Sequence, residues 1–276
     1  MRQPLFDFAI HYTGRVCVAR DLLLGRIERK WVPDPAEPGT TRLALESGGN
    51  ILDAVLVEPT SRAARASVLI CHGIGETVQH WHGVQRLLAA NGVASLVFDY
   101  SGYGKSSGAF RARQSELDAE AAFCALERLT APLPISLLGF SLGSGIAAAV
   151  LPRVRARSLL LCAAFTSIRA AARSIGIFGL LAYAAPAIWN SADSLRACEI
   201  PVQIVHGDKD RLFPVAMASA LKAACGSSAE LIVVPGVSHV EPYWRPQLSF
   251  WGPIVRHLVD ASALALDTDA RLKTGS

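Results

Sequence analysis

Seven short apolar runs, separated by helical stretches, constrain the fold of this chain more than any other feature. Each run is almost continuously apolar, as expected of strands that are buried on both faces of a parallel sheet. Strands that alternate with helices predict a mostly parallel sheet covered by helices on both faces. With 276 residues the chain is long enough for one large α/β domain. The runs lie near 51–57, 67–71, 94–99, 135–139, 158–162, 202–206 and 231–234.

The spacing of these runs predicts one domain with two short flanking segments. We expect an α/β domain over residues 26–264, preceded by an N-terminal extension (1–25) and followed by a polar C-terminal tail (265–276). Several prolines before the first run indicate a connecting loop rather than a domain boundary. The connection that leads to the run at 202–206 is unusually long. A cap is expected within it, over about residues 165–197.

The pattern Gly-x-Ser-x-Gly occurs at residues 139–143, directly after an apolar run and before an Ala-rich helical stretch. A serine on so sharp a turn has strained backbone geometry, and only small residues two positions away on either side let strand and helix pass closely. The turn raises the serine oxygen above the sheet edge, next to free N–H groups at the start of the helix. This context predicts a nucleophile elbow with Ser141 as the nucleophile.

An acid and a histidine follow Ser141 in the chain order that such an elbow requires. Asp210 comes shortly after the run at 202–206, and His239 follows the run at 231–234. Because the carboxyl ends of parallel strands meet at one edge of the sheet, all three side chains are expected there. Ser141, Asp210 and His239 are therefore predicted to form a catalytic triad.

Two other carboxylates could serve this histidine. Asp208 lies in the same loop as Asp210, but we assign it to the turn, because Asp side chains readily bond to nearby backbone N–H groups. Glu241 is a further candidate partner of His239, although its place indicates a solvated carboxylate at a helix start. His206, at the end of a strand run, is expected to be structural.

Two backbone N–H groups are predicted to form an oxyanion hole. One belongs to Leu142, the residue after the nucleophile, and the other lies in the loop after an earlier strand. That loop is His72-Gly73-Ile74-Gly75-Glu76, which follows the run at 67–71. Its glycines let the backbone approach a ligand oxygen, so Ile74 N–H is the expected second donor.

These blocks resemble those of the α/β-hydrolase superfamily. Within it, the chain is similar to the monoacylglycerol-lipase and serine-aminopeptidase-like branch, whose members carry HGxGE and DxxGxGxSxG blocks. The corresponding residues here are 72–76 and 99–108, and the matching blocks together span about residues 65–245. The resemblance implies an α/β-hydrolase fold with a small cap or lid insertion.

The predicted chemistry is hydrolysis of a carboxylic ester, with a small or lipid-like acyl group, through an acyl-enzyme. No metal or organic cofactor is expected. The same triad would also serve a thioesterase, an acyltransferase or an aminopeptidase, and Glu76 is the one nearby acid that could bind a substrate amine. A non-catalytic binding protein on this fold is the alternative from a different class. Such proteins usually lack a triad residue.

The cap segment contains the strongest indication of a substrate. Residues 175–189 carry no charge, contain Gly and Pro, and are too few to span a bilayer as a straight helix. They could form a cap helix with one packed face, or a lid whose apolar face lines an acyl pocket. We favour the lid, because a segment that is apolar on all sides suggests more than one contact surface. The candidate substrate-binding residues are Phe140, Phe178, Tyr183 and Trp189.

Charge and cysteine content limit the other partners. The formal net charge is +4, but no basic patch is interleaved with aromatic residues, so nucleic acid is not expected as a partner. Arg153, Arg155 and Arg157 indicate a solvated loop or, alternatively, peripheral contact with an anionic membrane surface. Six scattered cysteines and no secretory signal indicate a cytoplasmic protein with reduced thiols. The sequence does not predict an oligomeric state.

Overall fold

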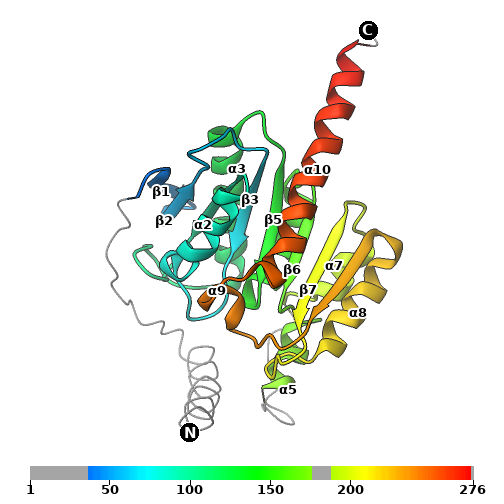
Figure 1. The fold of residues 1–276 in the computed structure, drawn as a ribbon. Helices are drawn as coiled ribbons and strands as arrows, with labels where there is room; N and C mark the ends of the chain where they lie inside the picture. Colours follow the sequence, from blue (N-terminus) through cyan, green and yellow to red (C-terminus); the bar gives the residue numbers. More distant parts are fainter. Residues whose placement is uncertain (1–36, 176–187, 275–276) are drawn as a thin grey trace, which may run out of the picture.

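The computed structural model describes residues 37–175 and 188–274. An eight-stranded sheet lies at its centre, in the order β1-β2-β4-β3-β5-β6-β7-β8 (Figure 1). The pairings β1–β2 and β2–β4 are antiparallel, and the remaining pairings are parallel. The strands are β1 (Thr40–Ser47), β2 (Asn50–Val57), β3 (Ala66–Cys71), β4 (Val93–Phe98), β5 (Ile135–Phe140), β6 (Leu159–Cys162), β7 (Val202–Gly207) and β8 (Ala229–Val234).

The prediction of a mostly parallel, doubly covered sheet is confirmed. All seven predicted runs are strands, and every residue of β3, β5, β6 and β7 is buried. The sequence analysis missed β1. Its residues alternate between partly buried and exposed, because β1 is an edge strand that pairs only with β2. An edge strand with exposed and charged residues gives a much weaker signal than a continuous apolar run.

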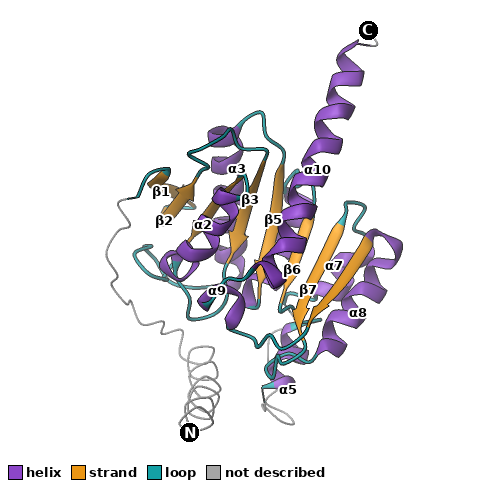
Figure 2. Cartoon of the chain, viewed as in Figure 1, coloured by secondary structure: helices purple, strands orange, loops and turns teal. Residues whose placement is uncertain are grey.

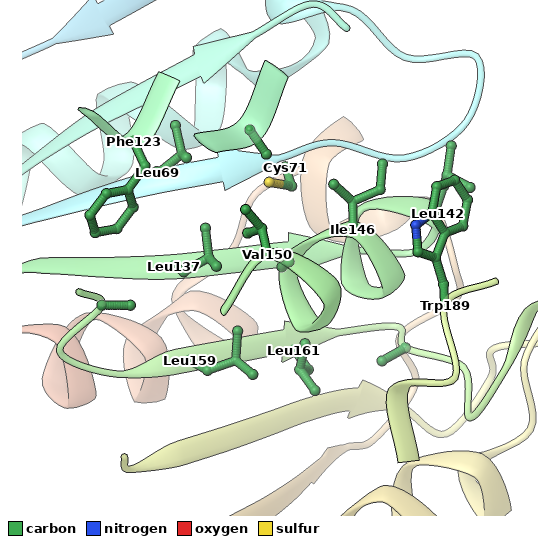
Figure 3. Close-up of a cluster of buried hydrophobic side chains, with 14 of the residues drawn as sticks. Leu69, Cys71, Phe123, Leu137, Leu142, Ile146, Val150, Leu159, Leu161 and Trp189 are labelled. Atoms are coloured by element: carbon green, nitrogen blue, oxygen red, sulfur yellow. The ribbon is translucent and has the colours of Figure 1, made fainter. Parts of the chain in front are cut away.

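Helices pack on both faces of the sheet (Figure 2). Residues of α3 (Ala112–Thr130), α4 (Leu142–Val150), α7 (Ser191–Arg196) and α8 (Val215–Cys225) belong to one core cluster. Residues of α2 (His82–Ala90) and α10 (Leu248–Thr274) belong to the other. Successive strand residues alternate between the two, since neighbouring side chains of a strand point to opposite faces. Figure 3 shows part of the first cluster, in which Leu69, Leu137 and Leu161 lie against the helix that carries Ile146.

Shorter elements complete the described chain. They are η1 (Val78–Trp81), η2 (Leu151–Arg153), α5 (Ile168–Ser174), η3 (Gly226–Ser228) and α9 (Glu241–Trp244). Of the predicted cap over 165–197, α5 and α7 are described, whereas residues 176–187 lie outside the described part. The predicted N-terminal extension also lies outside it.

The C-terminal helix α10 continues through most of the segment that was predicted as a polar tail, and its end projects beyond the sheet in Figure 1. No helix in residues 37–175 and 188–274 is both long and apolar enough to cross a bilayer.

Candidate active site

Ser141 occupies the sharp turn between β5 and α4. Its backbone has φ 51° and ψ −118°, a conformation that is unfavourable for a residue with a side chain. The neighbouring glycines allow this turn for steric reasons. A Cβ added at Gly143 would lie 1.9 Å from the carbonyl oxygen of Cys71, and one at Gly139 would lie 2.5 Å from the carbonyl oxygen of Gly143. The elbow therefore depends on glycine at both positions, as the sequence pattern predicts.

Three loops bring the predicted triad together at the carboxyl edge of the sheet. His239, in the loop between β8 and α9, has Nε2 3.0 Å from the Oγ of Ser141. Its Nδ1 lies 2.7 Å from Oδ2 of Asp210, which belongs to the loop after β7. All three residues are buried. The geometry suits a serine whose proton passes to the imidazole while a carboxylate orients the ring.

The acid is held by backbone donors from its own loop. Oδ1 of Asp210 accepts hydrogen bonds from the N–H groups of Leu212 and Phe213, each at 2.9 Å. Burial by itself raises the pKa of Asp210. The charge of His239, its hydrogen bond and the Phe213 N–H together outweigh burial, so this pKa lies below its ordinary value. Asp210 is therefore ionised at neutral pH and can stabilise a histidine cation.

The other carboxylates near His239 are occupied elsewhere. Oδ1 of Asp208 accepts from the backbone N–H of Gly236 at 2.6 Å, so this aspartate ties the two loops together. Oε2 of Glu241 accepts from the backbone N–H of Ser238 at 2.6 Å, at the start of α9. Both arrangements agree with the turn and helix-start roles that the sequence indicates.

His206 lies beneath the acid loop and is fully buried. Its Nε2 is 2.9 Å from the carbonyl oxygen of Phe213 and 3.4 Å from Oδ2 of Asp210. Burial lowers the pKa of His206, so the ring is neutral. The neutral ring donates to the Phe213 carbonyl and helps to fix the loop, which agrees with the expected structural role.

The two predicted oxyanion donors belong to segments that pack on one another. Leu142 is the first residue of α4, and Ile74 lies in the loop after β3. These segments touch at Gly143, where an added Cβ would lie 2.7 Å from the carbonyl oxygen of His72. Tyr100 also donates a hydrogen bond to that carbonyl at 3.0 Å, which fixes the beginning of the loop.

A buried carboxylate holds the loop that contains Ile74. Oε2 of Glu76 accepts from the backbone N–H of Gly73 and from Nε1 of Trp81, both at 2.8 Å. Burial raises the pKa of Glu76 to about 7, although both N–H groups and the charge of His239 oppose the rise. The carboxylate is directed into the loop and is not presented to solvent. It is therefore poorly placed to bind a substrate amine.

The second sequence block braces the element that follows this loop. Oδ1 of Asp99 accepts from the backbone N–H of Val78, the first residue of η1, at 2.8 Å. Ser106 donates to the carbonyl oxygen of Asp99 at 2.6 Å. A Cβ added at Gly104 would lie 1.7 Å from Oδ2 of Asp99, so the turn accepts only glycine there. This block is therefore a structural support for the site.

The structure corrects the prediction that Phe140 binds substrate. Phe140 ends β5 and is fully buried. Its ring centroid lies 5.5 Å from those of His239 and Trp81 and 5.4 Å from that of Tyr243. It has no exposed surface and packs against the imidazole of His239. The alternation of β5 side chains directs this residue into the core, whereas the next residue, Ser141, is on the turn.

Of the other substrate-binding candidates, only Trp189 is described. Its side chain is buried, its Nε1 donates to Oε1 of Glu116 at 3.2 Å, and its Cβ lies close to Gly145 of α4. Figure 3 shows it at the end of α4 that carries Leu142. Trp189 therefore packs on the helix that follows the nucleophile. Phe178 and Tyr183 lie outside the described residues.

Sequence reasoning missed two aromatic residues of the site. Phe213 packs edge-on against His239, with ring centroids 5.2 Å apart at 87°. Trp81 supports Glu76 through its indole N–H. The only available signal was position, because Phe213 follows the acid loop and Trp81 follows the HGxGE block. Within residues 37–175 and 188–274, no three His, Cys, Asp or Glu side chains are grouped as metal ligands.

Comparisons with known proteins agree with this arrangement. The profile of the family described as "Serine aminopeptidase, S33" matches residues 62–191. The chain is 27% identical over 199 residues to the lysophosphatidylserine lipase ABHD12 of Danio rerio. The alignment covers 65% of this chain and 52% of that protein. It is 26% identical over 212 residues to protein bem46 of Schizosaccharomyces pombe. That alignment covers 72% of this chain and 71% of bem46. The chain thus spans about half the length of the zebrafish relative.

Solved structures share the fold. An esterase from Pyrococcus furiosus superposes with a TM-score of 0.69 at 16% identity, covering 85% of this chain and 97% of that one. The esterase domain of a Rhodothermus marinus protein gives a TM-score of 0.62 at 20% identity, covering 78% and 95%. With the parallel sheet and the elbow, these matches show an α/β-hydrolase fold. Over residues 62–191 the chain is similar to the serine-aminopeptidase-like branch of proteins with this fold.

Proposed function

We propose that this protein is a serine hydrolase that cleaves carboxylic esters through Ser141, His239 and Asp210. The observation that carries the proposal is the continuous chain of contacts from Oδ2 of Asp210 through the imidazole to Oγ of Ser141. A serine hydroxyl alone is a weak nucleophile, and a base within hydrogen-bond reach activates it. Here the base is in turn oriented by an ionised carboxylate, which is the arrangement that acyl transfer requires.

The reaction follows from these roles. Nε2 of His239 takes the proton as Oγ attacks the ester carbonyl, and Asp210 stabilises the resulting imidazolium. The N–H groups of Ile74 and Leu142 hold the negative oxygen of the tetrahedral intermediate. His239 then protonates the leaving alcohol, which departs and leaves an acyl-enzyme on Ser141. Water, deprotonated by the same imidazole, releases the acid and restores the serine.

The substrate class is an ester with a small or lipid-like acyl group. The relatives support this class, since one is named a lysophosphatidylserine lipase and several structural neighbours are named esterases. A thioesterase or acyltransferase would use the same atoms, with a thiol leaving group or an alcohol acceptor. The aminopeptidase alternative is less favoured, because Glu76 is buried within the oxyanion loop.

Two measurements test the proposal. A fluorophosphonate probe should label the wild-type protein and leave Ser141→Ala unlabelled, because the probe reacts only with an activated serine. Hydrolysis of p-nitrophenyl esters from acetyl to palmitoyl should fall at least about 10⁴-fold in Ser141→Ala. Labelling and hydrolysis that persist in Ser141→Ala would refute the assignment. A wild-type protein that is neither labelled nor active would instead favour a binding protein on this fold.

A further inference from the structure

Two large apolar side chains lie exposed just beyond the loop of the predicted catalytic histidine. Trp244 is 68% exposed and Leu248 is 62% exposed, more than any other large apolar residue whose side chain the structure describes. Trp244 ends α9, and Leu248 begins α10. Single exposed apolar residues are common on protein surfaces. Two such residues four positions apart, one of them a tryptophan, form a feature that needs a physical reason.

Their exposure is imposed by a firmly packed segment. Between them and on either side, other residues anchor the chain to the core. Pro242 is buried, and its carbonyl oxygen accepts a hydrogen bond from Nε1 of the fully buried Trp251 at 2.7 Å. Pro246 packs on α2, since a Cβ added at Gly83 would lie 3.4 Å from its Cγ. Trp244 and Leu248 therefore extend from a segment that is anchored by the buried Pro242 and Phe250.

This segment lies at the catalytic edge of the molecule. In Figure 1 the arrowheads of the parallel strands point toward the edge at which α5 and α9 lie. The histidine loop leads directly into α9, so five positions separate His239 from Trp244. The same loop is joined to the acid loop, because Lys209 N–H donates to the carbonyl oxygen of Val237 at 3.0 Å.

Basic residues accompany the apolar pair. Arg245 is exposed directly after Trp244, and Lys209 and Arg211 are exposed on the acid loop. These loops also hold three acidic residues. Asp210 is buried against His239, whereas Asp208 accepts from Gly236 N–H and Glu241 from Ser238 N–H. The catalytic edge thus combines a tryptophan and a leucine with three exposed cationic side chains. This combination matches the headgroup region of an anionic bilayer, where tryptophan partitions and cations gain electrostatic energy.

The area of the patch argues against a second protein chain as the occupant. A large aromatic side chain buries about 150–250 Å² at most, so two partly exposed side chains supply well below the roughly 800 Å² per partner of a stable protein interface. A lipid surface has no such minimum. We propose that Trp244, Arg245 and Leu248 form a docking patch that seats the catalytic edge on an anionic phospholipid surface. The proposal rests on the proposed ester-hydrolase function for its purpose, although binding can be measured separately.

Vesicle co-sedimentation of the full chain tests this inference. All binding proteins carry Ser141→Ala, so that lipid hydrolysis does not complicate the measurement. We expect binding to vesicles of equal parts phosphatidylcholine and phosphatidylserine, with much weaker binding to phosphatidylcholine alone. Adding Trp244→Ala and Leu248→Ala should weaken partitioning at least about tenfold, because both apolar anchors are lost. Arg245→Glu should weaken binding to the anionic vesicles alone.

A matched control removes an exposed leucine elsewhere. Leu129 lies near the end of α3 and is 46% exposed, and Leu129→Ala should bind vesicles as the parent does. The docking inference is overturned if anionic vesicles are not bound, or if the Trp244→Ala, Leu248→Ala protein binds as well as the parent. It is also overturned if Trp244 is shielded from acrylamide quenching without lipid, since another chain segment or a second copy would then cover the patch.

Activity on a soluble ester separates this inference from the proposed function. With Ser141 intact, Trp244→Ala, Leu248→Ala should hydrolyse p-nitrophenyl acetate at the wild-type rate while losing activity on vesicle-bound esters. Loss of both activities together would indicate a structural defect in the histidine loop and contradict a docking role. Vesicle binding without any Ser141-dependent hydrolysis would leave the docking patch in place and refute the enzyme.

Discussion

Oδ2 of Asp210 lies 2.7 Å from Nδ1 of His239, whereas Asp208, two residues earlier in the same loop, bonds to the backbone of Gly236. Two aspartates of one turn, two positions apart, thus have different roles. The difference comes from the turn itself, in which the N–H groups of Leu212 and Phe213 hold the second carboxylate toward the imidazole.

The two aspartates provide a matched pair for mutagenesis. Asp210→Asn should lower kcat by about 10⁴-fold, because an amide no longer selects the Nδ1–H tautomer or stabilises the imidazolium. Asp208→Asn keeps an oxygen that can accept from Gly236 N–H and should retain near wild-type kcat. Steady-state hydrolysis of a p-nitrophenyl ester measures both. Equal losses in the two variants would contradict the assignment of Asp210.

The buried Glu76 carboxylate should stabilise the oxyanion loop. Glu76→Ala leaves the N–H groups of Gly73 and Trp81 without their acceptor, at a cost of about 1–3 kcal/mol each in the free energy of unfolding. A looser loop should also reduce kcat more than it raises KM, because the oxyanion forms only in the transition state. Glu76→Gln keeps a carbonyl oxygen for both donors and is the control. Urea unfolding and ester kinetics would show the contrast, and an Ala variant as stable as the Gln variant would speak against it.

The same carboxylate should make stability depend on pH. Burial raises the pKa of Glu76 to about 7, so the folded protein holds this proton where the unfolded chain has released it. The free energy of unfolding should therefore fall as the pH rises from about 4.5 to about 7 and level off above, by on the order of 2–3 kcal/mol. Glu76→Gln lacks this titration, and the difference between the two proteins isolates it. The pKa of Asp99 is also raised, but this residue is present in both proteins, so its contribution cancels in the difference. If the difference in free energy of unfolding between the wild type and Glu76→Gln did not change with pH, titration of Glu76 would not contribute to stability.

The elbow should tolerate no side chain at its second glycine. Gly143→Ala places a methyl group about 2 Å from the Cys71 carbonyl oxygen, which requires strand and helix to separate. We expect a loss of several kcal/mol in stability, or no soluble protein, measured by thermal denaturation. Gly83→Ala, whose Cβ would be 3.4 Å from Pro246, should change stability by less than about 1 kcal/mol. A folded, active Gly143→Ala protein would show that the elbow is less crowded than described.

Phe140 should affect stability and not acyl selectivity. Phe140→Leu removes part of a ring that is packed among His239, Trp81 and Tyr243, and should cost about 1–2 kcal/mol in the free energy of unfolding. Among p-nitrophenyl esters of increasing acyl length, the variant should hydrolyse fastest the same chain length as the wild type. A shifted optimum would restore Phe140 as a substrate-binding residue.

Features that depend on short-range rules could be predicted from the amino-acid order alone. Apolar runs identified seven of the eight strands. Strands β3 to β7 are buried on both faces, which leaves no alternation in their sequences. The elbow at Ser141 followed from sterics within five residues. The order of serine, acid and histidine followed from a parallel topology that carries successive loops to one edge.

The remaining features depend on contacts between segments that are distant in the chain. The edge strand β1 is stabilised by pairing with β2, which its own residues hardly indicate. Phe140 was assigned to the substrate by its place beside the nucleophile, yet the pleat of β5 turns it into the core. The role of Phe213 depends on its contact with His239, which is distant in sequence, and the role of Glu76 depends on the loop fold that turns its carboxylate toward Gly73 N–H and Trp81. Such contacts are set by how loops pack together, and no local pattern encodes them.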